Sequence, residues 1–387
     1  MKAARLPASP GTILRYNRQN SGGFLLSSIL TPDHTQDFSN LSGDFRNPEP
    51  ASPLETVMKE KNMKTLTKLI YTAFAAGVLA IGAVTANGAL NDLFASINGS
   101  GDNGGGFIYQ YTPAGVQSTF ASGLSRPRGL VFDHFGNLFV ANTTFDGNGV
   151  GHGTIVKITP SGVQSTFATL SDPNFGPEGL AFDLAGNLFV MAIDFADPNL
   201  ASTIFKFTPG RVQSTFGSIE GQGFGVAFDV AGNLFAAGNG NIYKFTPDGT
   251  RTVFADSSQF PPNNGPIDLA FDRFGNLFAS TESGLLSDPS NVIMKFTPNG
   301  VGTPFATDLD RYPRGLAFDR LGNLFVAQVG VDPNPGGNIL KFTPNGVGTV
   351  FTMVPGGNNS GPEWLTFQFL PTPRPRPTPH PRPTQQF

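Results

Sequence analysis

The sequence predicts an all-β protein: a six-bladed β-propeller of four-stranded blades, closed by strands from both ends of the chain. Two observations favour this fold class. A unit of 43 to 50 residues repeats, and its aspartate recurs at intervals of 50, 46, 43 and 47 residues (Asp133, Asp183, Asp229, Asp272 and Asp319). Each unit also contains four short apolar stretches separated by turn residues. A fixed period of this length with four strands per unit is typical of propeller blades.

The first two strands of each unit are joined by a tight turn. In the second intact unit one apolar stretch ends at Phe182 and the next begins at Leu188, with Asp183 and Gly186 between them. An aspartate accepts hydrogen bonds from its own turn, and a glycine tolerates the positive φ that a hairpin requires. The same spacing in the other intact units predicts the same hairpin in each.

The third strand ends in Thr-Pro, and a second turn leads to the fourth strand. Pro298-Asn299-Gly300 shows the pattern, in which proline presets φ and glycine completes the turn. The stretches are apolar without clean alternation, which fits sheets buried on both faces. We expect the phenylalanines, of which the whole chain has 37, to fill the space between the sheets. A row of immunoglobulin-like sandwiches would need each unit to close its own core, and about 47 residues is too few.

Only five units are intact in sequence order, and fragments at the two ends supply the sixth. Residues 91–95 read as a second strand without a first, and residues 363–368 read as a first strand without a second. Joined, they complete a blade, which agrees with six Thr-Pro third strands. Closure of this kind removes exposed sheet edges and holds both ends of the propeller, which we place at residues 90–370.

The flanking segments differ from the repeats. Residues 63–86 resemble a secretory signal, with Lys64 and Lys68 before an apolar run that ends in small residues. We interpret residues 1–62, which are polar and without period, as a disordered leader that reflects a misassigned start. An uncleaved membrane anchor after a cytoplasmic tail is the alternative, because eighteen apolar residues could just span a bilayer. Residues 371–387 alternate Pro with Thr and Arg and predict an extended, disordered tail.

Composition excludes several function classes. The chain has no cysteine, so an exported form would depend on packing and not on disulfides. Residues 87–370 carry 13 Lys and Arg against 22 Asp and Glu, a net charge of −9, with no basic stripe for nucleic acid. The propeller has two histidines, His134 and His152, so a three-histidine zinc site is excluded. There is no nucleophile elbow, P-loop or EF-hand loop.

The run Pro-Glu-Gly-Leu-Ala-Phe-Asp-Leu-Ala-Gly-Asn-Leu-Phe-Val (177–190) resembles NHL-repeat propellers and the gluconolactonase (senescence-marker-protein) superfamily. The resemblance covers about residues 90–370 and implies a six-bladed fold. It is poorly specific for function, because this fold hosts lactonases, lyases and binding modules. For a lactonase it implies one divalent cation, such as calcium or zinc, held by Glu, Asn and Asp side chains at the mouth of the central channel.

The positions corresponding to those metal ligands can be read from the repeat, one per blade. They are Arg128, Glu178, Phe224, Ile267, Arg314 and Glu363. Glu178 and Glu363 keep carboxylates, and Asp268 lies one residue out of register, so these three are the candidate metal ligands. In ring order Arg314, Glu363, Arg128 and Glu178 form an arc of alternating charge. We interpret the arc as a structural ion network, because buried charges persist when they are paired; an acid–base or anion-binding site is the alternative.

Two functional hypotheses follow. The first is an exported, monomeric, non-catalytic scaffold without a cofactor, which binds a protein or a carbohydrate and, after signal cleavage, no membrane. Its binding surface would be the face of the disc that carries the longer loops, such as 142–153 and 191–202. The second is a metal-dependent lactone hydrolase with its site at the channel mouth. Convergence of the three carboxylates favours the hydrolase, and pairing of the glutamates with the arginines favours the scaffold.

Overall fold

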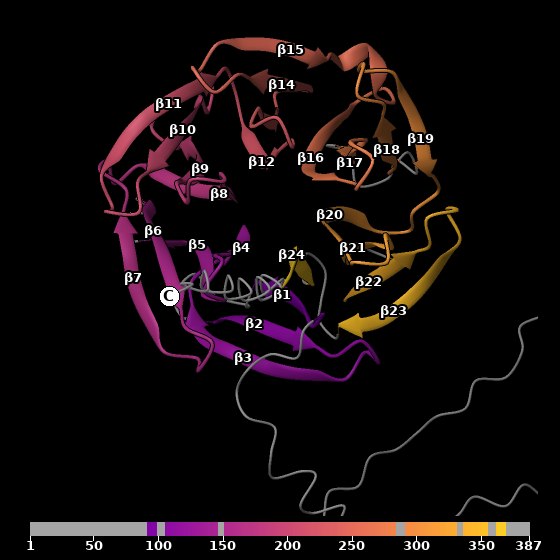
Figure 1. Cartoon of the computed structure of the whole chain (residues 1–387), viewed down its shortest axis with the longest axis horizontal. Coiled ribbons are helices and arrows are strands. Elements are labelled where there is room, and N and C mark those ends of the chain that lie inside the picture. Colours follow the sequence, from indigo (N-terminus) through magenta and orange to yellow (C-terminus); the bar gives the residue numbers. More distant parts are fainter. Residues whose placement is uncertain are drawn as a thin grey trace, which may run out of the picture. The chain divides into compact units, whose positions relative to one another are not determined.

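The computed structural model describes residues 91–98, 105–145, 151–283, 291–330, 336–354 and 361–368. These residues form six four-stranded antiparallel sheets arranged around a central axis (Figure 1). The predicted six-bladed propeller is therefore confirmed. The leader (1–62), the signal or anchor (63–86) and the tail (371–387) lie outside the described residues.

The blade that contains both ends of the propeller confirms the predicted closure. Its sheet has the order β24 (Pro362–Phe367), β1 (Leu93–Ile97), β2 (Gly106–Tyr111) and β3 (Gln117–Leu124). β24 pairs antiparallel with β1, with Leu93 opposite Phe367 and Ala95 opposite Leu365. The last described strand, β24, is thus the innermost strand of the blade that contains the first, β1. The two strands lie side by side in Figure 1.

The other five blades each use four consecutive strands, with the first innermost. The second blade contains β4 (Leu130–Phe132), β5 (Leu138–Phe145), β6 (Gly151–Ile158) and β7 (Gln164–Thr169). The third contains β8 (Phe175–Phe182), β9 (Leu188–Asp194), β10 (Ser202–Phe207) and β11 (Gln213–Ile219). The fourth contains β12 (Gly223–Phe228), β13 (Leu234–Gly238), β14 (Asn241–Phe245) and β15 (Arg251–Ala255).

The fifth and sixth blades complete the ring. The fifth contains β16 (Asn264–Phe271), β17 (Leu277–Ser283), β18 (Ile293–Phe296) and β19 (Gly302–Ala306). The sixth contains β20 (Tyr312–Phe318), β21 (Leu324–Val329), β22 (Gly337–Phe342) and β23 (Gly348–Val354). Several strands continue into segments expected to be loops: β5 and β6 stay paired out to Phe145 and Gly151, within the expected loop 142–153.

The hairpin between the first two strands has the predicted chemistry. Oδ1 of Asp183 accepts hydrogen bonds from the backbone N–H groups of Ala185 and Asn187, and its Oδ2 accepts one from the Asn187 side chain. Gly186 has a φ of 81°. The aspartate–asparagine pair repeats at the other intact units, so one local sequence fixes the same turn five times.

The core lies between neighbouring blades and is built on phenylalanine. Phe139 of the second blade is edge-on to Phe167 of its own blade and to Phe182 of the next, with ring centroids 5.0 and 5.1 Å apart. The same triplet recurs around the ring, for example at Phe189 with Phe216 and Phe228. Edge-to-face pairs of this kind add stabilisation beyond burial, so the repeated phenylalanines join one blade to the next.

Around the channel, the innermost strands approach one another through glycine. A Cβ at Gly129 would lie 2.2 Å from the carbonyl oxygen of Glu178 on the next blade, and one at Gly179 would lie 2.4 Å from that of Phe224. Gly225 and Gly315 face their neighbours equally closely. In the two remaining blades Asp268 and Trp364 occupy the position of these glycines. Their side chains fill space that the backbone of the neighbouring strand occupies in the other blades.

Candidate functional site at the channel mouth

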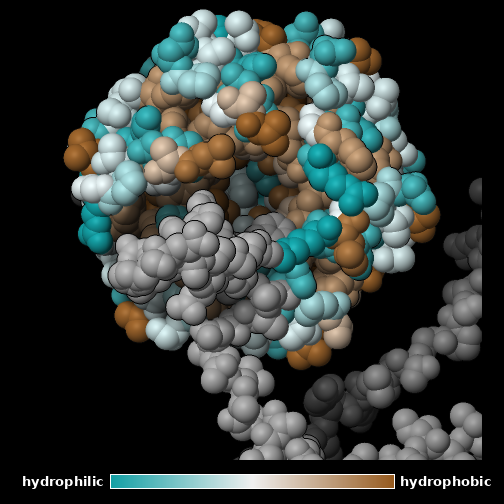
Figure 2. Space-filling model, viewed as in Figure 1, coloured by the Kyte–Doolittle hydropathy of each residue, from teal (hydrophilic) through white to brown (hydrophobic). Residues whose placement is uncertain are grey.

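A cavity of about 640 Å³ opens at the end of the channel where the second strands end and the first strands begin. The longer connections lie at this end, which we call the loop face. The cavity is bordered by both charged and aromatic side chains, among them Arg126, Arg128, Glu178, Phe195 and Phe224. The hollow at the centre of the ring is visible in the space-filling view (Figure 2).

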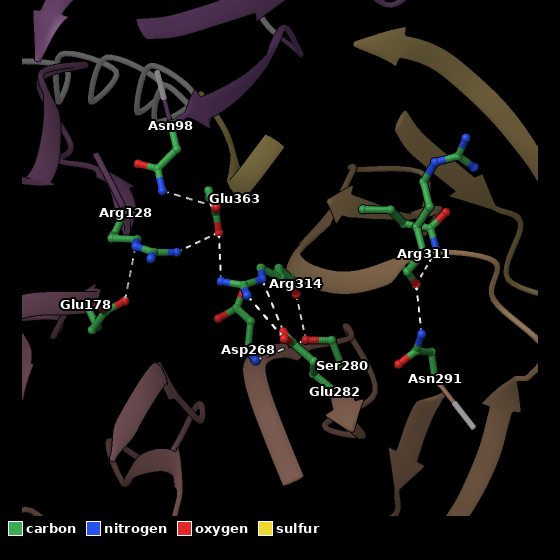
Figure 3. Close-up of polar contacts among 11 residues, drawn as sticks. Asn98, Arg128, Glu178, Asp268, Ser280, Glu282, Asn291, Arg311, Arg314 and Glu363 are labelled. Atoms are coloured by element: carbon green, nitrogen blue, oxygen red, sulfur yellow. Dashed lines mark hydrogen bonds and ion pairs between the residues drawn. The ribbon is translucent and has the colours of Figure 1, made fainter. Parts of the chain in front are cut away.

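The structure brings the four residues of the predicted arc into one chain of ion pairs (Figure 3). Nη1 of Arg128 lies 2.6 Å from Oε2 of Glu363, and Nη1 of Arg314 lies 3.0 Å from the same oxygen. Nε of Arg128 lies 3.7 Å from Oε2 of Glu178. The Glu363 side chain is only 4% exposed, so it is held between two guanidinium groups with little access to water.

Sequence reasoning missed two members of this network, Glu282 and Asn98. Arg314 binds Glu282 with two nitrogens, Nε at 3.1 Å from Oε2 and Nη2 at 3.2 Å from Oε1. Asn98 donates from Nδ2 to Oε1 of Glu363 at 3.3 Å. Both residues lie five positions after the leucine that begins the second strand of their blade, at Leu277 and Leu93. Comparison of that position across the units could have found them.

Burial and pairing set the ionisation of the three glutamates. Burial raises the pKa of Glu178, and the nearby charge of Arg128 lowers it only partly. Burial likewise raises the pKa of Glu282 against the effect of Arg314. Burial also acts to raise the pKa of Glu363, but Arg128 and Arg314 outweigh it and hold that pKa below its usual range. Glu363 is therefore the ionised centre of the network.

Asp268 takes part in a different set of contacts. Its Oδ2 accepts a hydrogen bond from the backbone N–H of Leu316 on the next blade at 2.8 Å, and the Trp364 side chain also hydrogen-bonds to it. Its backbone N–H donates to Oγ of Ser280, which donates to the carbonyl of Arg314. Asp268 thus joins three blades at the level of the glycine contacts. Burial raises the pKa of this carboxyl to about 7, against the opposing hydrogen bonds.

The three candidate metal ligands do not form a donor set for a divalent cation. Glu363 is committed to two guanidinium groups and Asp268 to a backbone N–H. Glu178 lies next to Arg128, whose positive charge opposes a cation there. Within the described ranges no cluster of three or more His, Asp or Glu side chains is suited to hold a metal ion. The residues present at the mouth therefore do not fit the cation that the family resemblance implies.

Comparison with solved structures agrees with the fold. TolB from Acinetobacter baumannii is 11% identical, with a TM-score of 0.54 over 73% of this chain and 67% of that chain. The periplasmic gluconolactonase PpgL from Pseudomonas aeruginosa is 18% identical, with a TM-score of 0.50 over 73% of this chain and all of that chain. A calcium-binding regucalcin from Agrobacterium tumefaciens is 16% identical, with a TM-score of 0.40 over 58% of this chain and 72% of that chain.

The neighbours thus include a gluconolactonase, as the sequence resemblance indicated, and the structures of TolB and PpgL show at these identities that the fold is shared. No family model and no curated protein matches the sequence. Among the described residues, no helix is long and apolar enough to cross a membrane.

Proposed function

We propose that this chain is an exported, non-catalytic propeller that binds a protein or glycan partner through its loop face. The observation that carries the proposal is the pairing of Glu363 with both Arg128 and Arg314. A carboxylate held in this way supports a fixed channel mouth and is not free to bind a cation or to transfer protons. What remains accessible is a preformed cavity with aromatic and amide side chains at its border.

Export is part of the proposal and rests on the signal-like segment 63–86. The absence of cysteine is compatible with a ring stabilised by packing alone. PpgL, which shares the fold, is described as periplasmic. Export would place the loop face where it can meet extracellular or periplasmic partners.

Thermal unfolding of the full-length protein with calcium or zinc, followed by a panel of lactones, separates this proposal from the hydrolase alternative. We expect no stabilisation by either metal and no turnover. We also expect Glu363→Gln to lower the melting temperature, because both arginines lose their shared anion. A metal-dependent stabilisation that disappears in Glu178→Gln and Glu363→Gln, together with lactone turnover, would establish the alternative.

The binding face is tested by a matched pair of surface changes. Phe195 borders the mouth and is 40% exposed, whereas Phe135 is 70% exposed in a hairpin turn at the opposite end of the blades. On a glycan array or with a purified protein partner, Phe195→Asp should abolish binding and Phe135→Asp should preserve it. The reverse pattern would assign binding to the turn face and contradict the proposal.

A further inference from the structure

Arg126 differs from the other charged residues at the mouth. It lies four residues before Leu130, where the innermost strand of the second blade begins, and its φ of 43° is in the left-handed region that an arginine seldom adopts. Its guanidinium carbon lies 4.9 Å from the centre of the Phe145 ring. No ion pair or hydrogen bond joins its guanidinium to any other residue in the part of the chain that the structure describes. Arg126 therefore presents an unpaired cation to the cavity.

The charge balance at the mouth limits the ligand that Arg126 could hold. Glu178, Arg128, Glu363, Arg314 and Glu282 pair among themselves and together carry one excess negative charge when all are ionised. Arg126 balances that excess from a distance. A monoanion can pair with its free guanidinium, but a dianion such as phosphate would meet stronger repulsion from the glutamates. A carboxylate also matches the planar fork of a guanidinium, which can bind it through two hydrogen bonds.

The other residues that border the cavity indicate the chemical character of the ligand apart from its charged group. Ile193 and Phe195 of the third blade, Phe224 of the fourth and Ile267 of the fifth also border the cavity. These side chains favour an apolar or aromatic group. A volume of about 640 Å³ is in the range of small-molecule sites.

We infer that the mouth cavity binds a small organic carboxylate with an apolar body, its carboxylate on Arg126 and its body against Phe195 and Phe224. This inference rests on the proposed function, because it assigns a ligand class to the mouth of the proposed binding face. The ion-pair network would hold the charged part of the border in place, and the ring of Phe145, which also borders the cavity, would orient the Arg126 guanidinium.

The probe is 3-phenylpropionate, titrated calorimetrically into the full-length protein. We expect Arg126→Gln to weaken its binding roughly tenfold or more, because a hydrogen-bonded charge pair is lost. Arg273→Gln is the matched control, since Arg273 also stacks on a phenylalanine, Phe274, but in a hairpin turn at the other end of the blades. The control should bind the probe as the wild type does. Similar melting temperatures for both variants would show that folding is unaffected.

Two further probes test the charge and the body separately. The neutral analogue 3-phenyl-1-propanol should bind at least tenfold more weakly, and galacturonate, which has a carboxylate on a polar body, should also bind more weakly. Equal affinity of the neutral analogue, unchanged binding in Arg126→Gln, or no binding of 3-phenylpropionate at millimolar concentration would each overturn the inference. None of these outcomes affects the binding-module proposal, which depends on the Phe195 and Phe135 comparison and on the absence of metal-dependent turnover.

Discussion

Arg128 shows how a single side chain joins three blades at the channel mouth. It extends from the start of the second blade, contacts Glu363 of the closing blade and Glu178 of the third, and lies over the Trp364 ring at 5.8 Å. Its side chain is 15% exposed, so most of its charge is compensated by protein groups and not by water. The energetic consequence of losing a partner from such a network exceeds that of losing a surface ion pair.

Arg128→Ala should therefore lower the free energy of unfolding by on the order of 3 kcal/mol, because Glu363 and Glu178 lose a partner while buried. Chemical denaturation measures the change. Arg251→Ala is the control: Arg251 pairs with Glu220 near the surface, and such pairs contribute about 0–1 kcal/mol. Equal effects of the two substitutions would show that water compensates the mouth network and that it has no structural role.

Asp268 links the stability of the ring to pH. Its pKa rises from an ordinary value of 3.8 to about 7 in the folded protein, with burial as the main cause. Between these values the folded state holds a proton that the unfolded state has released. The contribution of Asp268 to stability is thus fully present below about pH 4 and is lost as pH rises to about 7.

Asp268→Asn, which imitates the protonated carboxyl, should stabilise the protein at pH 8, by roughly 4 kcal/mol at most. The advantage should shrink steadily as the pH falls to 4. Denaturation curves of both proteins across this range give the difference directly, and other titrating groups cancel in it. A difference that does not vary with pH would mean that the carboxyl keeps its ordinary pKa in the folded state.

At the scale of elements, the innermost strands follow two packing rules. Four innermost strands carry a glycine at the same position facing the next blade, and there the backbone of the next innermost strand packs directly against the glycine. These glycines are Gly129, Gly179, Gly225 and Gly315. Where this position holds Asp268 or Trp364, the backbone N–H donates to a serine on the second strand of the blade, Ser280 or Ser96. The serines satisfy buried donors, which would otherwise cost free energy.

The closing strand β24 has a larger role than its six residues suggest. It pairs with β1, and its Trp364, Leu365 and Phe367 are all at most 6% exposed. A chain that ends at Gly361 should therefore lose cooperative unfolding, because the first blade keeps an open edge and loses its packing against the sixth and second blades. A chain that ends at Leu370 should melt like the full-length protein. Circular dichroism melting curves compare the two, and similar melting temperatures would show that β24 does not close the ring.

At the scale of the whole molecule, the ring converts sequence positions far apart into one site. Glu363 and Arg128 are 235 residues apart, yet they form the shortest ion pair of the mouth network. The arc of Arg314, Glu363, Arg128 and Glu178 could be anticipated because one position per repeat faces the channel. Once the blade number is known, these positions follow one another around the mouth.

Other parts of the site could not be read in this way. Glu282 lies near the end of β17 and Asn98 directly follows β1, and both strands are the second of their blades. Their side chains reach the arc from this neighbouring strand, whereas the sequence pattern identified positions at or near the starts of the innermost strands only. We expected Asp268 to lie beside Glu178 and Glu363 because it is only one residue out of register with them in the repeat. In the structure its side chain accepts a hydrogen bond from Leu316 and contacts Trp364 instead.

The sequence by itself determined the blade, the number of blades and the closure. These features depend on local turn chemistry and on a period, and both are properties of the chain alone. Only the tertiary structure decided which charges pair, which remain free and which lie buried. Pairing and burial depend on distances of a few ångströms between strands of different blades, which the packing of the phenylalanine core sets. For that reason the tertiary structure, and not the sequence, distinguished Arg126 as a cation without an ion pair among the described residues of the mouth and Glu363 as the anion shared by two arginines.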